Sequence, residues 1–210
     1  MKNIVLIADI VSSRKIKDRD KIQERLNTLL KKINKESRSI LSPMTITLGD
    51  EFQCVYSSAD EIFMHIWKIL NTAYPEEIRF SFGIGKITTS INKLQAIGMD
   101  GPAFYEAREG LTQLKQDGYL FNVRHSNNNS DVINFVRNSL FLISYNIGWW
   151  KKNRINIMSL LADDMQVKAI AKKLKITEQA VYKNISNGGL QLVLNITGNI
   201  TRIFNNLLKS

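Results

Sequence analysis

Acidic residues stand at the ends of two expected strands in the first quarter of the chain. Asp9 ends the apolar run 4–8, which is typical of a strand buried on both faces. Asp50 and Glu51 follow a glycine within the stretch 45–56, whose apolar pattern predicts two strands joined by a tight turn. Turn chemistry alone explains such a Gly-Asp pair. Carboxylate oxygens are also the ligands that Mg²⁺ prefers, so a metal site is the second interpretation.

The residues after Asp9 add groups that suit phosphate. Small hydroxyl side chains and two cations follow the strand, and loop amides with Arg14 or Lys15 can meet phosphate oxygens. If the strands that carry Asp9 and Asp50 are neighbours in one sheet, both carboxylates converge on the same ions, as in two-metal phosphoryl-transfer sites. The expected nucleotide-binding residues are Ser12, Ser13, Arg14, Lys15 and Gly49.

Helices and further strands must hold these groups in place. Apolar residues at helical spacing and alternating apolar residues predict both kinds of element. Helices are expected from Asp18 or Asp20 to about Ser37, over 58–74 and from Pro102, and strands over 78–84 and 119–123. The segment SNNNS at 126–130 is the clearest linker. The sequence therefore predicts an α+β body that ends near residue 128.

Composition restricts the classes of protein. The chain has 210 residues, a formal net charge of +10 and one cysteine, which excludes an internal disulfide and fits a reducing compartment. The N-terminal apolar run is short and stops at a charged residue, so we expect no signal peptide and a cytoplasmic location. Residues 1–130 hold 18 Lys/Arg against 15 Asp/Glu, whereas residues 131–210 hold 11 against 4. The basic excess near the C-terminus suits a polyanion, although a solvated basic face also explains it.

The apolar stretch 132–150 is the strongest candidate for a membrane span. Arg137, Asn138 and Asn146 interrupt it. Its apolar positions 132, 135, 136, 140, 143 and 147 recur at helical spacing, which predicts a partly buried amphipathic helix instead. We therefore expect no contact with a membrane.

The last third of the chain contains only helical signals. Residues 165–175 and 178–185 predict two helices joined by a turn, with the spacing of a helix-turn-helix core at Ala169, Ile170, Leu174, Ile176, Val181 and Ile185. A helical hairpin without a DNA role fits the same pattern. The expected DNA-binding residues are Lys172, Lys173, Lys175, Thr177, Gln179, Lys183 and Asn184. A final helix over 190–208 either packs internally or builds a homodimer.

Four motifs in register carry a resemblance to known families. ADIVSSR at 8–14, GDEF at 49–52, FSFGIG at 80–85 and GPAFYEAR at 101–108 follow the order of class III nucleotidyl cyclases and GGDEF diguanylate cyclases. Together with the flanking residues they more closely resemble the SatD family. The resemblance implies a ferredoxin-like, cyclase or palm-type antiparallel sheet with helices over residues 1–128. It also implies a small all-α domain over 129–210, with the helix-turn-helix at about 165–186.

The resemblance also implies roles for single residues. Asp9 and Asp50 match the metal-binding acids, with the backbone carbonyl of Ile10 as a further ligand and Mg²⁺ or Mn²⁺ as the ion. Glu51 matches the acid that follows the metal ligand, and Arg108 matches the arginine that stabilises the transition state. These two are the expected catalytic residues.

Three positions depart from the family pattern. Phe104 stands where an asparagine is expected, Ile46 replaces an adenine-reading lysine, and Leu48 replaces the first glycine of GGDEF.

Two functions follow from these residues. In the first, a nucleoside triphosphate and a divalent metal bind without turnover and change the DNA affinity of the C-terminal domain. In the second, the same site is a metal-dependent nucleotidyl cyclase or transferase that attacks the α-phosphorus with a ribose hydroxyl. Phe104 and Ile46 favour the first, and the intact acid pair favours metal binding in both.

Overall fold

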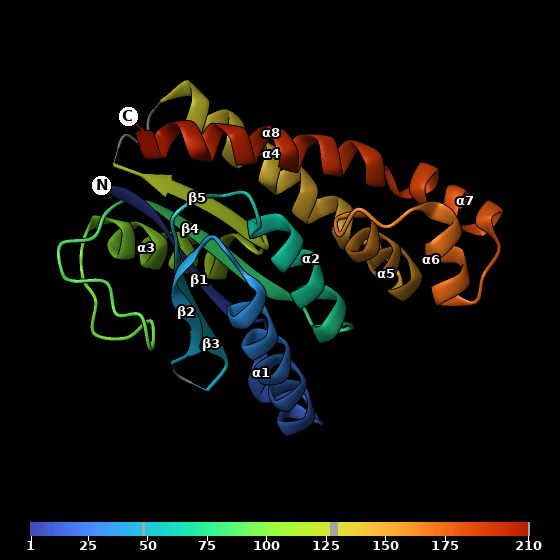
Figure 1. The fold of residues 1–210 in the computed structure, drawn as a ribbon, viewed down its shortest axis with the longest axis horizontal. Coiled ribbons are helices and arrows are strands. Elements are labelled where there is room, and N and C mark those ends of the chain that lie inside the picture. The colour runs from blue at the N-terminus through green and yellow to red at the C-terminus, as the bar shows by residue number, and fades with distance from the viewer. Residues whose placement is uncertain (48, 127–129, 210) are drawn as a thin grey trace.

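A five-stranded sheet lies at the centre of the protein. The computed structural model describes residues 1–47, 49–126 and 130–209. The strand order is β2-β3-β1-β4-β5, so that the first strand is central (Figure 1). The strands are β1 (Lys2–Ile10), β2 (Ile40–Ile46), β3 (Glu51–Tyr56), β4 (Ile78–Lys86) and β5 (Phe121–His125).

Helices connect the strands and form the C-terminal third. The helices of the α+β body are α1 (Arg19–Glu36), α2 (Ile62–Ala73) and α3 (Pro102–Asp117). The C-terminal helices are α4 (Asp131–Ile147), α5 (Lys152–Leu161), α6 (Val167–Leu174), α7 (Glu178–Gly188) and α8 (Leu190–Lys209). The predicted α+β class and the helical C-terminal region are confirmed.

The sheet is mixed rather than purely antiparallel. β1 pairs antiparallel with both β3 and β4, and β2 pairs antiparallel with β3, as a ferredoxin-like sheet requires. β5 pairs parallel with β4, because the crossover through α3 returns the chain in the same direction. The expected antiparallel sheet therefore gains a parallel edge strand.

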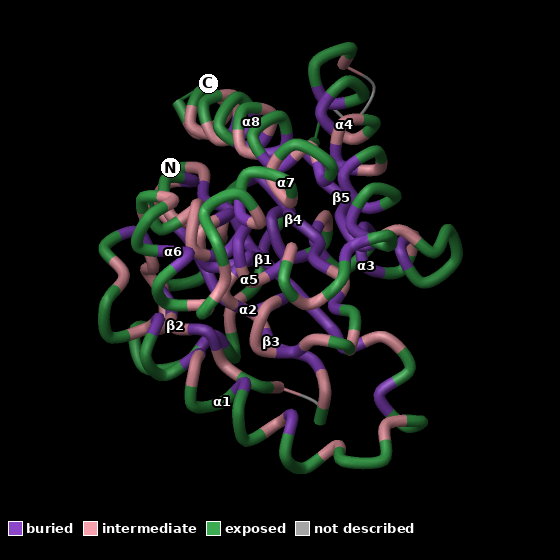
Figure 2. Tube along the Cα trace, turned by 90° about the vertical axis from the view of Figure 1, so that its right-hand side faces the viewer, coloured by how far each residue is buried: buried purple, intermediate pink, exposed green. Residues whose placement is uncertain are grey.

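The two faces of the sheet carry different layers. Leu6 and Ala8 of β1 belong to the large core that α1, α2, α4 and α8 help to build, whereas Val5 and Ile7 pack against α3. Because successive side chains of a strand point to opposite faces, the apolar run of β1 supplies both cores. Figure 2 shows the resulting buried centre. Asp9, at the end of this strand, falls on the face that α3 covers.

Helix α3 approaches β4 unusually closely at Gly83. A Cβ atom added there would overlap the carbonyl oxygen of Ala103 and would lie 2.5 Å from the amide nitrogen of Ala107. The glycines of this strand therefore admit the backbone of α3. This contact fixes α3 above the sheet, and with it the side chains of the following turns.

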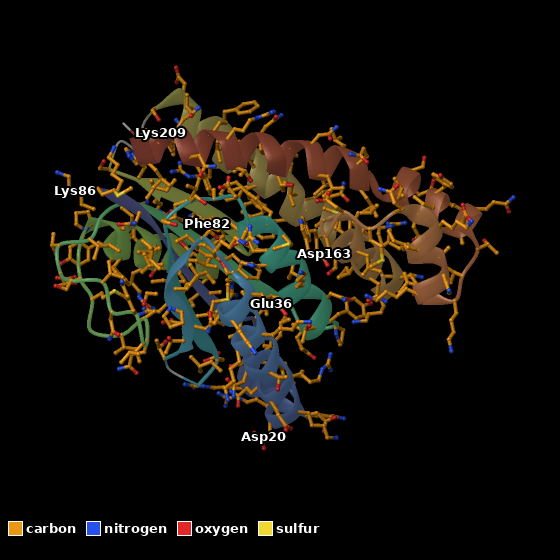
Figure 3. The ribbon with its side chains drawn as sticks, viewed as in Figure 1. Asp20, Glu36, Phe82, Lys86, Asp163 and Lys209 are labelled. Carbon is orange, nitrogen blue, oxygen red and sulfur yellow. The ribbon has the colours of Figure 1, made fainter. Side chains whose placement is uncertain are left out.

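The C-terminal helices share one hydrophobic core with the sheet. Phe204 of α8 packs edge-on against Phe82 of β4, with ring centroids 5.5 Å apart, and Figure 3 shows Phe82 on the sheet beneath α8. On the predicted face of α8, Leu190, Thr197 and Ile200 are buried as well, so that helix packs internally. The central residues of the predicted linker, 127–129, lie outside the described residues, as does Leu48.

Helix α4 is buried along one face, as predicted, but that face holds fewer of the apolar residues than predicted. Val136, Leu140, Ile143 and Ile147 are buried as expected. Val132 and Phe135 were expected on the same face and are exposed, so those two assignments are wrong. Both faces of α4 carry apolar residues, which is why periodicity alone could not separate them. Among the helices that the structure describes, none is long and apolar enough to cross a membrane.

Helices α6 and α7 follow each other across a short turn, at the place where the sequence predicted two helices. Lys175 ends α6 in the left-handed conformation, and the Thr177 hydroxyl accepts a hydrogen bond from the amide of Ala180 at 3.1 Å, capping α7. Ile170 and Val181 are buried in the large core. Ala169, predicted as a core residue, is exposed, and Ala171 is buried in its place. Helices α5–α7 project from the end of the sheet, and α8 returns along it (Figure 1).

Candidate functional site

Strand register brings acidic and basic side chains together where β1 ends. Asp9 lies directly opposite Glu51 of β3 and directly opposite Arg79 of β4. Residues that face each other across an antiparallel pair point to the same side of the sheet. The three side chains therefore share the face that α3 covers.

Helix α3 adds two cations to this group. The Arg108 guanidinium donates to Glu51 Oε2 at 2.6 Å, and Lys115 Nζ lies 3.1 Å from Asp9 Oδ2. Arg79 Nη1 is 3.4 Å from Asp9 Oδ1. Both carboxylates are nearly buried, whereas Arg108 and Lys115 are half-exposed. We refer to Asp9, Glu51, Arg79, Arg108 and Lys115 as the strand-end cluster.

Asp50 lies beside Asp9 in the chain fold but has different partners. The Ile10 amide donates to the Asp50 carbonyl oxygen at 3.2 Å, so the turn sits against the last residue of β1. The Ser13 hydroxyl donates to Asp50 Oδ2 at 2.5 Å. The structure thus brings Asp9 and Asp50 to the same strand end. In this arrangement each carboxylate is held by its own set of side chains.

The predicted phosphate-binding residues surround the loop after β1. Ser12 adopts a left-handed conformation (φ 52°), and a single 3₁₀ turn follows over Ser13–Lys15. Arg14 and Lys15 are exposed. Gly49, with φ 62°, presents its carbonyl oxygen to Gln23 at 2.5 Å. The loop is therefore open to solvent on its cationic side.

A cavity of about 550 Å³ opens beside this loop. Ser12 and Lys15 line it, together with Lys21 and Arg25 of α1. Cationic side chains around a cavity of this size suit a phosphorylated small molecule. The cavity adjoins the predicted nucleotide-binding loop rather than the strand-end cluster.

A second cavity, of about 480 Å³, lies between the helices of the sheet body and α6. Leu29 and Ile33 of α1 line one side, and Lys173 and Leu174 of α6 line another. An ion pair of 2.7 Å between Lys68 and Asp163 spans the same region, and Figure 3 labels Asp163 there. Helix α1 therefore runs from the loop after β1 to the wall that α6 completes.

The donor set at the strand end consists of oxygen atoms. The carboxylates of Asp9, Asp50 and Glu51 and the carbonyl of Ile10 are hard donors of the type that Mg²⁺ and Mn²⁺ bind. Within the described residues, no three His, Cys, Asp or Glu side chains are grouped as a ready-made metal site. The residue types therefore fit a divalent cation.

Sequence reasoning missed Arg79 and Lys115. Arg79 belongs to a strand whose register against β1 no sequence pattern fixed. Lys115 follows Arg108 by seven residues, which is two helical turns, so both side chains lie on one face of α3. That spacing is the signal from which Lys115 could have been identified. The ion-pair partner of Arg108 is the nearly buried Glu51, a contact between α3 and β3 that the sequence did not predict.

The predicted DNA-binding residues occupy one end of the molecule. Lys172, Lys173 and Lys175 are exposed at the end of α6, and Gln179 and Lys183 are exposed on α7. Thr177 is exposed too, with its hydroxyl engaged in the cap of α7. The Asn184 amide donates to the Ala180 carbonyl at 2.8 Å on its own helix.

Comparisons with known proteins give one family and two structures. A model described as the SatD family matches residues 3–203 of the chain. One similar structure is described as a bacterial light-regulated adenylyl cyclase, with 15% identity and a TM-score of 0.44. That match covers 59% of this chain and 42% of the other, so the chain spans less than half of that protein.

The second structure is described as the catalytic core of a rhodopsin-guanylyl cyclase with converted specificity, in complex with ATPαS. Its identity is 15% and its TM-score 0.37, and the match covers 53% of this chain and 71% of the other. No match was found among curated proteins.

Proposed function

This chain belongs to the SatD family, and from that premise we propose that it is a nucleotide-responsive, DNA-binding regulator. A nucleoside triphosphate binds with Mg²⁺ or Mn²⁺ where β1 ends. The bound nucleotide changes the affinity of helices α6 and α7 for DNA.

The observation that carries this proposal is the concentration of opposite charges at one strand end. Asp9 and Glu51 are nearly buried and face the same side, and three cations contact them. Asp50 adjoins them through the 3.2 Å bond from the Ile10 amide. Acids that hold a cation, next to cations that hold phosphate, are the two requirements of a metal–triphosphate site.

The metal would be held by the carboxylates of Asp9 and Asp50 and by the Ile10 carbonyl, with Glu51 beside them. When bound, a divalent cation neutralises charge on the phosphate oxygens. Lys115 and Arg79 contact Asp9, so each can exchange that carboxylate for a phosphate oxygen. Arg14 and Lys15 add exposed positive charge on the loop side.

Binding without turnover is favoured by Phe104. This side chain is buried in the apolar cluster with Val5, Ala107 and Leu111, so its position presents no polar group to a substrate. Arg108 supports the alternative, a nucleotidyl cyclase or transferase, because it lies within hydrogen-bond distance of Glu51. Product formation is therefore an explicit outcome of the test.

A continuous path supports coupling to DNA. Helix α1 begins after the phosphate-binding loop, and its last turns line the cavity that Lys173 and Leu174 of α6 complete. A shift of α1 upon nucleotide binding would act on α6 through this wall and through the Lys68–Asp163 ion pair.

Titration calorimetry with ATP and GTP in the presence of Mn²⁺ tests the binding site. We expect the wild-type chain to bind, and Asp9→Asn and Asp50→Asn to lose metal-dependent binding. Lys115→Met should weaken triphosphate binding about tenfold, which corresponds to roughly 1.4 kcal/mol. The affinity of this variant for Mn²⁺ alone should change less than its affinity for triphosphate. Incubation with labelled triphosphate and chromatography of the products decides between binding and turnover.

Asp100→Asn is the matched control for the acids. Asp100 lies in the loop before α3, and its carboxylate accepts a hydrogen bond from the hydroxyl of Tyr105 rather than contacting the strand-end cluster. Lys93→Met, in the same loop, is the control for Lys115. Equal binding by wild type and Asp50→Asn would contradict the metal assignment. If the wild-type chain forms a product from the triphosphate and Asp50→Asn does not, the chain is a nucleotidyl cyclase or transferase rather than a regulator that binds without turnover.

Electrophoretic shifts with random DNA over a salt series test the second half of the proposal. Lys172→Ala together with Lys173→Ala should reduce the slope of log affinity against log salt by about 1.8, since each phosphate contact contributes roughly 0.9. Lys31→Ala with Lys32→Ala on α1 removes the same charge elsewhere. If both double variants lower the affinity equally, net charge rather than this surface binds DNA.

A further inference from the structure

Helix α4 and the turn that follows it present an unpartnered apolar face to solvent. Phe135, Leu142, Tyr145 and Trp149 are each 68–71% exposed, although they are large and apolar. Figure 2 shows the exposed side of α4 turned away from the sheet. Monomeric proteins rarely expose contiguous apolar patches of this kind, so the face has a partner.

The spacing of these residues matches a helix–helix seam. Phe135, Leu142 and Trp149 recur every seven residues, and Asn138 and Tyr145 lie three residues after the first two. Phe135, Asn138, Leu142 and Tyr145 are the a and d positions of two heptads, the pattern by which one helix packs against another. Trp149 continues this spacing in the turn after α4. A single asparagine within such a seam is a device that fixes register and the number of strands.

The charge distribution identifies the partner as a second copy. The chain carries a net charge of +10, so two copies repel each other over most of their surface. They can approach most closely through a surface that carries no cations. The seam has none, and its flanking positions Asn134, Ser139, Phe141 and Asn146 are uncharged too. A helix that lies on a membrane would carry lysines and arginines beside its apolar face.

Charges at the two ends of α4 favour an antiparallel pair. Asp131 opens the helix and Lys151 follows its end. In an antiparallel pair each Asp131 approaches the lysine end of the partner helix, whereas a parallel pair would place the two aspartates together. The helix dipoles also oppose each other favourably in the antiparallel arrangement.

The exposed area is sufficient for a specific dimer. Aromatic side chains bury roughly 150–250 Å² each, so three of them at about 70% exposure and one leucine offer on the order of 400–600 Å² per copy. Two copies then bury about 1,000 Å², which is the lower limit of specific interfaces.

We propose that two copies of this chain form a two-fold dimer by packing their α4 helices against each other through Phe135, Leu142 and Tyr145, with Trp149 contributing from the turn after each helix. The dimer places two helix-turn-helix units in one particle. It uses a surface separate from the strand-end cluster, so its test is independent of nucleotide binding.

Sedimentation velocity of the full chain tests this proposal. We expect dimers for the wild type, and monomers for Leu142→Glu and for Leu142→Lys at the same concentration. A 1:1 mixture of these two variants should recover the dimer, because opposite charges then lie close together near the two-fold axis. Leu94→Glu, at a 90% exposed loop position, is the matched control and should remain dimeric.

Cross-linking tests the orientation, because the single cysteine Cys54 is buried and does not interfere. A mixture of Phe135→Cys and Tyr145→Cys should form a mixed disulfide. Self-linking of Phe135→Cys alone would overturn the antiparallel arrangement.

A wild-type chain that stays monomeric at about 100 µM would overturn the dimer, because this concentration saturates interfaces of micromolar affinity. A membrane role would also overturn the dimer. In that case the wild-type chain binds phosphatidylglycerol vesicles, and Leu142→Glu abolishes this binding without changing the oligomeric state of the chain.

Discussion

At the scale of single residues, His65 shows how burial sets a protonation state. Its ring lies inside the core, with Nδ1 2.9 Å from the hydroxyl oxygen of Tyr56. Burial lowers the pKa of His65 from 6.5 to about 4, and Lys68 acts in the same direction, whereas Glu61 opposes them. The folded protein therefore holds this histidine neutral at pH values where an unfolded chain would protonate it.

Stability should decline in mild acid because of His65. The unfolded chain binds more protons than the folded one between pH 6.5 and about 4, so the free energy of unfolding falls as the pH drops through that window and is constant above it. The loss reaches up to about 3 kcal/mol at 1.36 kcal/mol per pKa unit. Urea denaturation at pH 7.5, 6, 5 and 4.5 measures it.

His65→Gln is the control, because the variant cannot gain this proton. Its stability should depend less on pH than that of the wild type, and the remaining slope would come from His125, whose pKa burial also lowers. Parallel curves for wild type and variant would contradict the assignment. Glu61 acts at lower pH: burial raises its pKa, but hydrogen bonds from Ser37 and Ser39 outweigh burial and lower it to about 2.

At the scale of elements, the position of α3 depends on the absence of a side chain. The helix starts above Gly83 and Gly85, and its next turns carry Arg108 and Lys115 to the two acids of the sheet. An error in this contact would displace both cations together. The packing of one helix on one strand thus determines the geometry of the candidate site.

Gly83→Ala should therefore destabilise the fold severely. Its new methyl group meets backbone atoms of α3, which cannot move away without lifting the helix, so we expect a loss of about 3 kcal/mol or more in the free energy of unfolding. Gly198→Ala is the matched substitution, because nothing lies within 4 Å of its added Cβ in α8. That variant should be stabilised by about 0.5–1 kcal/mol. Thermal denaturation compares them, and equal effects would disprove the contact.

The sequence predicted most elements because their signals are local. The buried face of α1, the proline that starts α3 and the Thr177 cap of α7 all agree with the structure. Register is not local: no pattern in the chain placed Arg79 opposite Asp9, and none made β5 parallel to β4. The exposed face of α4 escaped prediction because that helix is apolar on both sides.

At the scale of the whole molecule, one apolar core extends from the sheet into the last helix. It contains residues of β1, α2, α4 and α8. Removal of the C-terminal helices would uncover the face of the sheet that they now protect. Charge substitutions on the surface are therefore better probes of the helix-turn-helix than truncation.

Phe204→Ala should destabilise the entire chain rather than its C-terminal region alone. Removing a fully buried phenylalanine leaves a cavity beside Phe82, and the expected loss is about 3–5 kcal/mol. Circular dichroism and tryptophan fluorescence should report a single coincident transition at a lower denaturant concentration. Two separate transitions would indicate that the sheet and the helices unfold independently. Leu192→Ala, at an exposed position of the same helix, should change stability little.

The contact between Phe82 and Phe204 also has a consequence for biosynthesis. The ribosome makes Phe204 about 120 residues after Phe82, which takes on the order of 6 to 24 s at roughly 5–20 residues per second. Throughout that interval the nascent sheet has an uncovered apolar side. A chaperone that engages emerging chains would find its strongest target in this protein between the release of β4 and the arrival of α8.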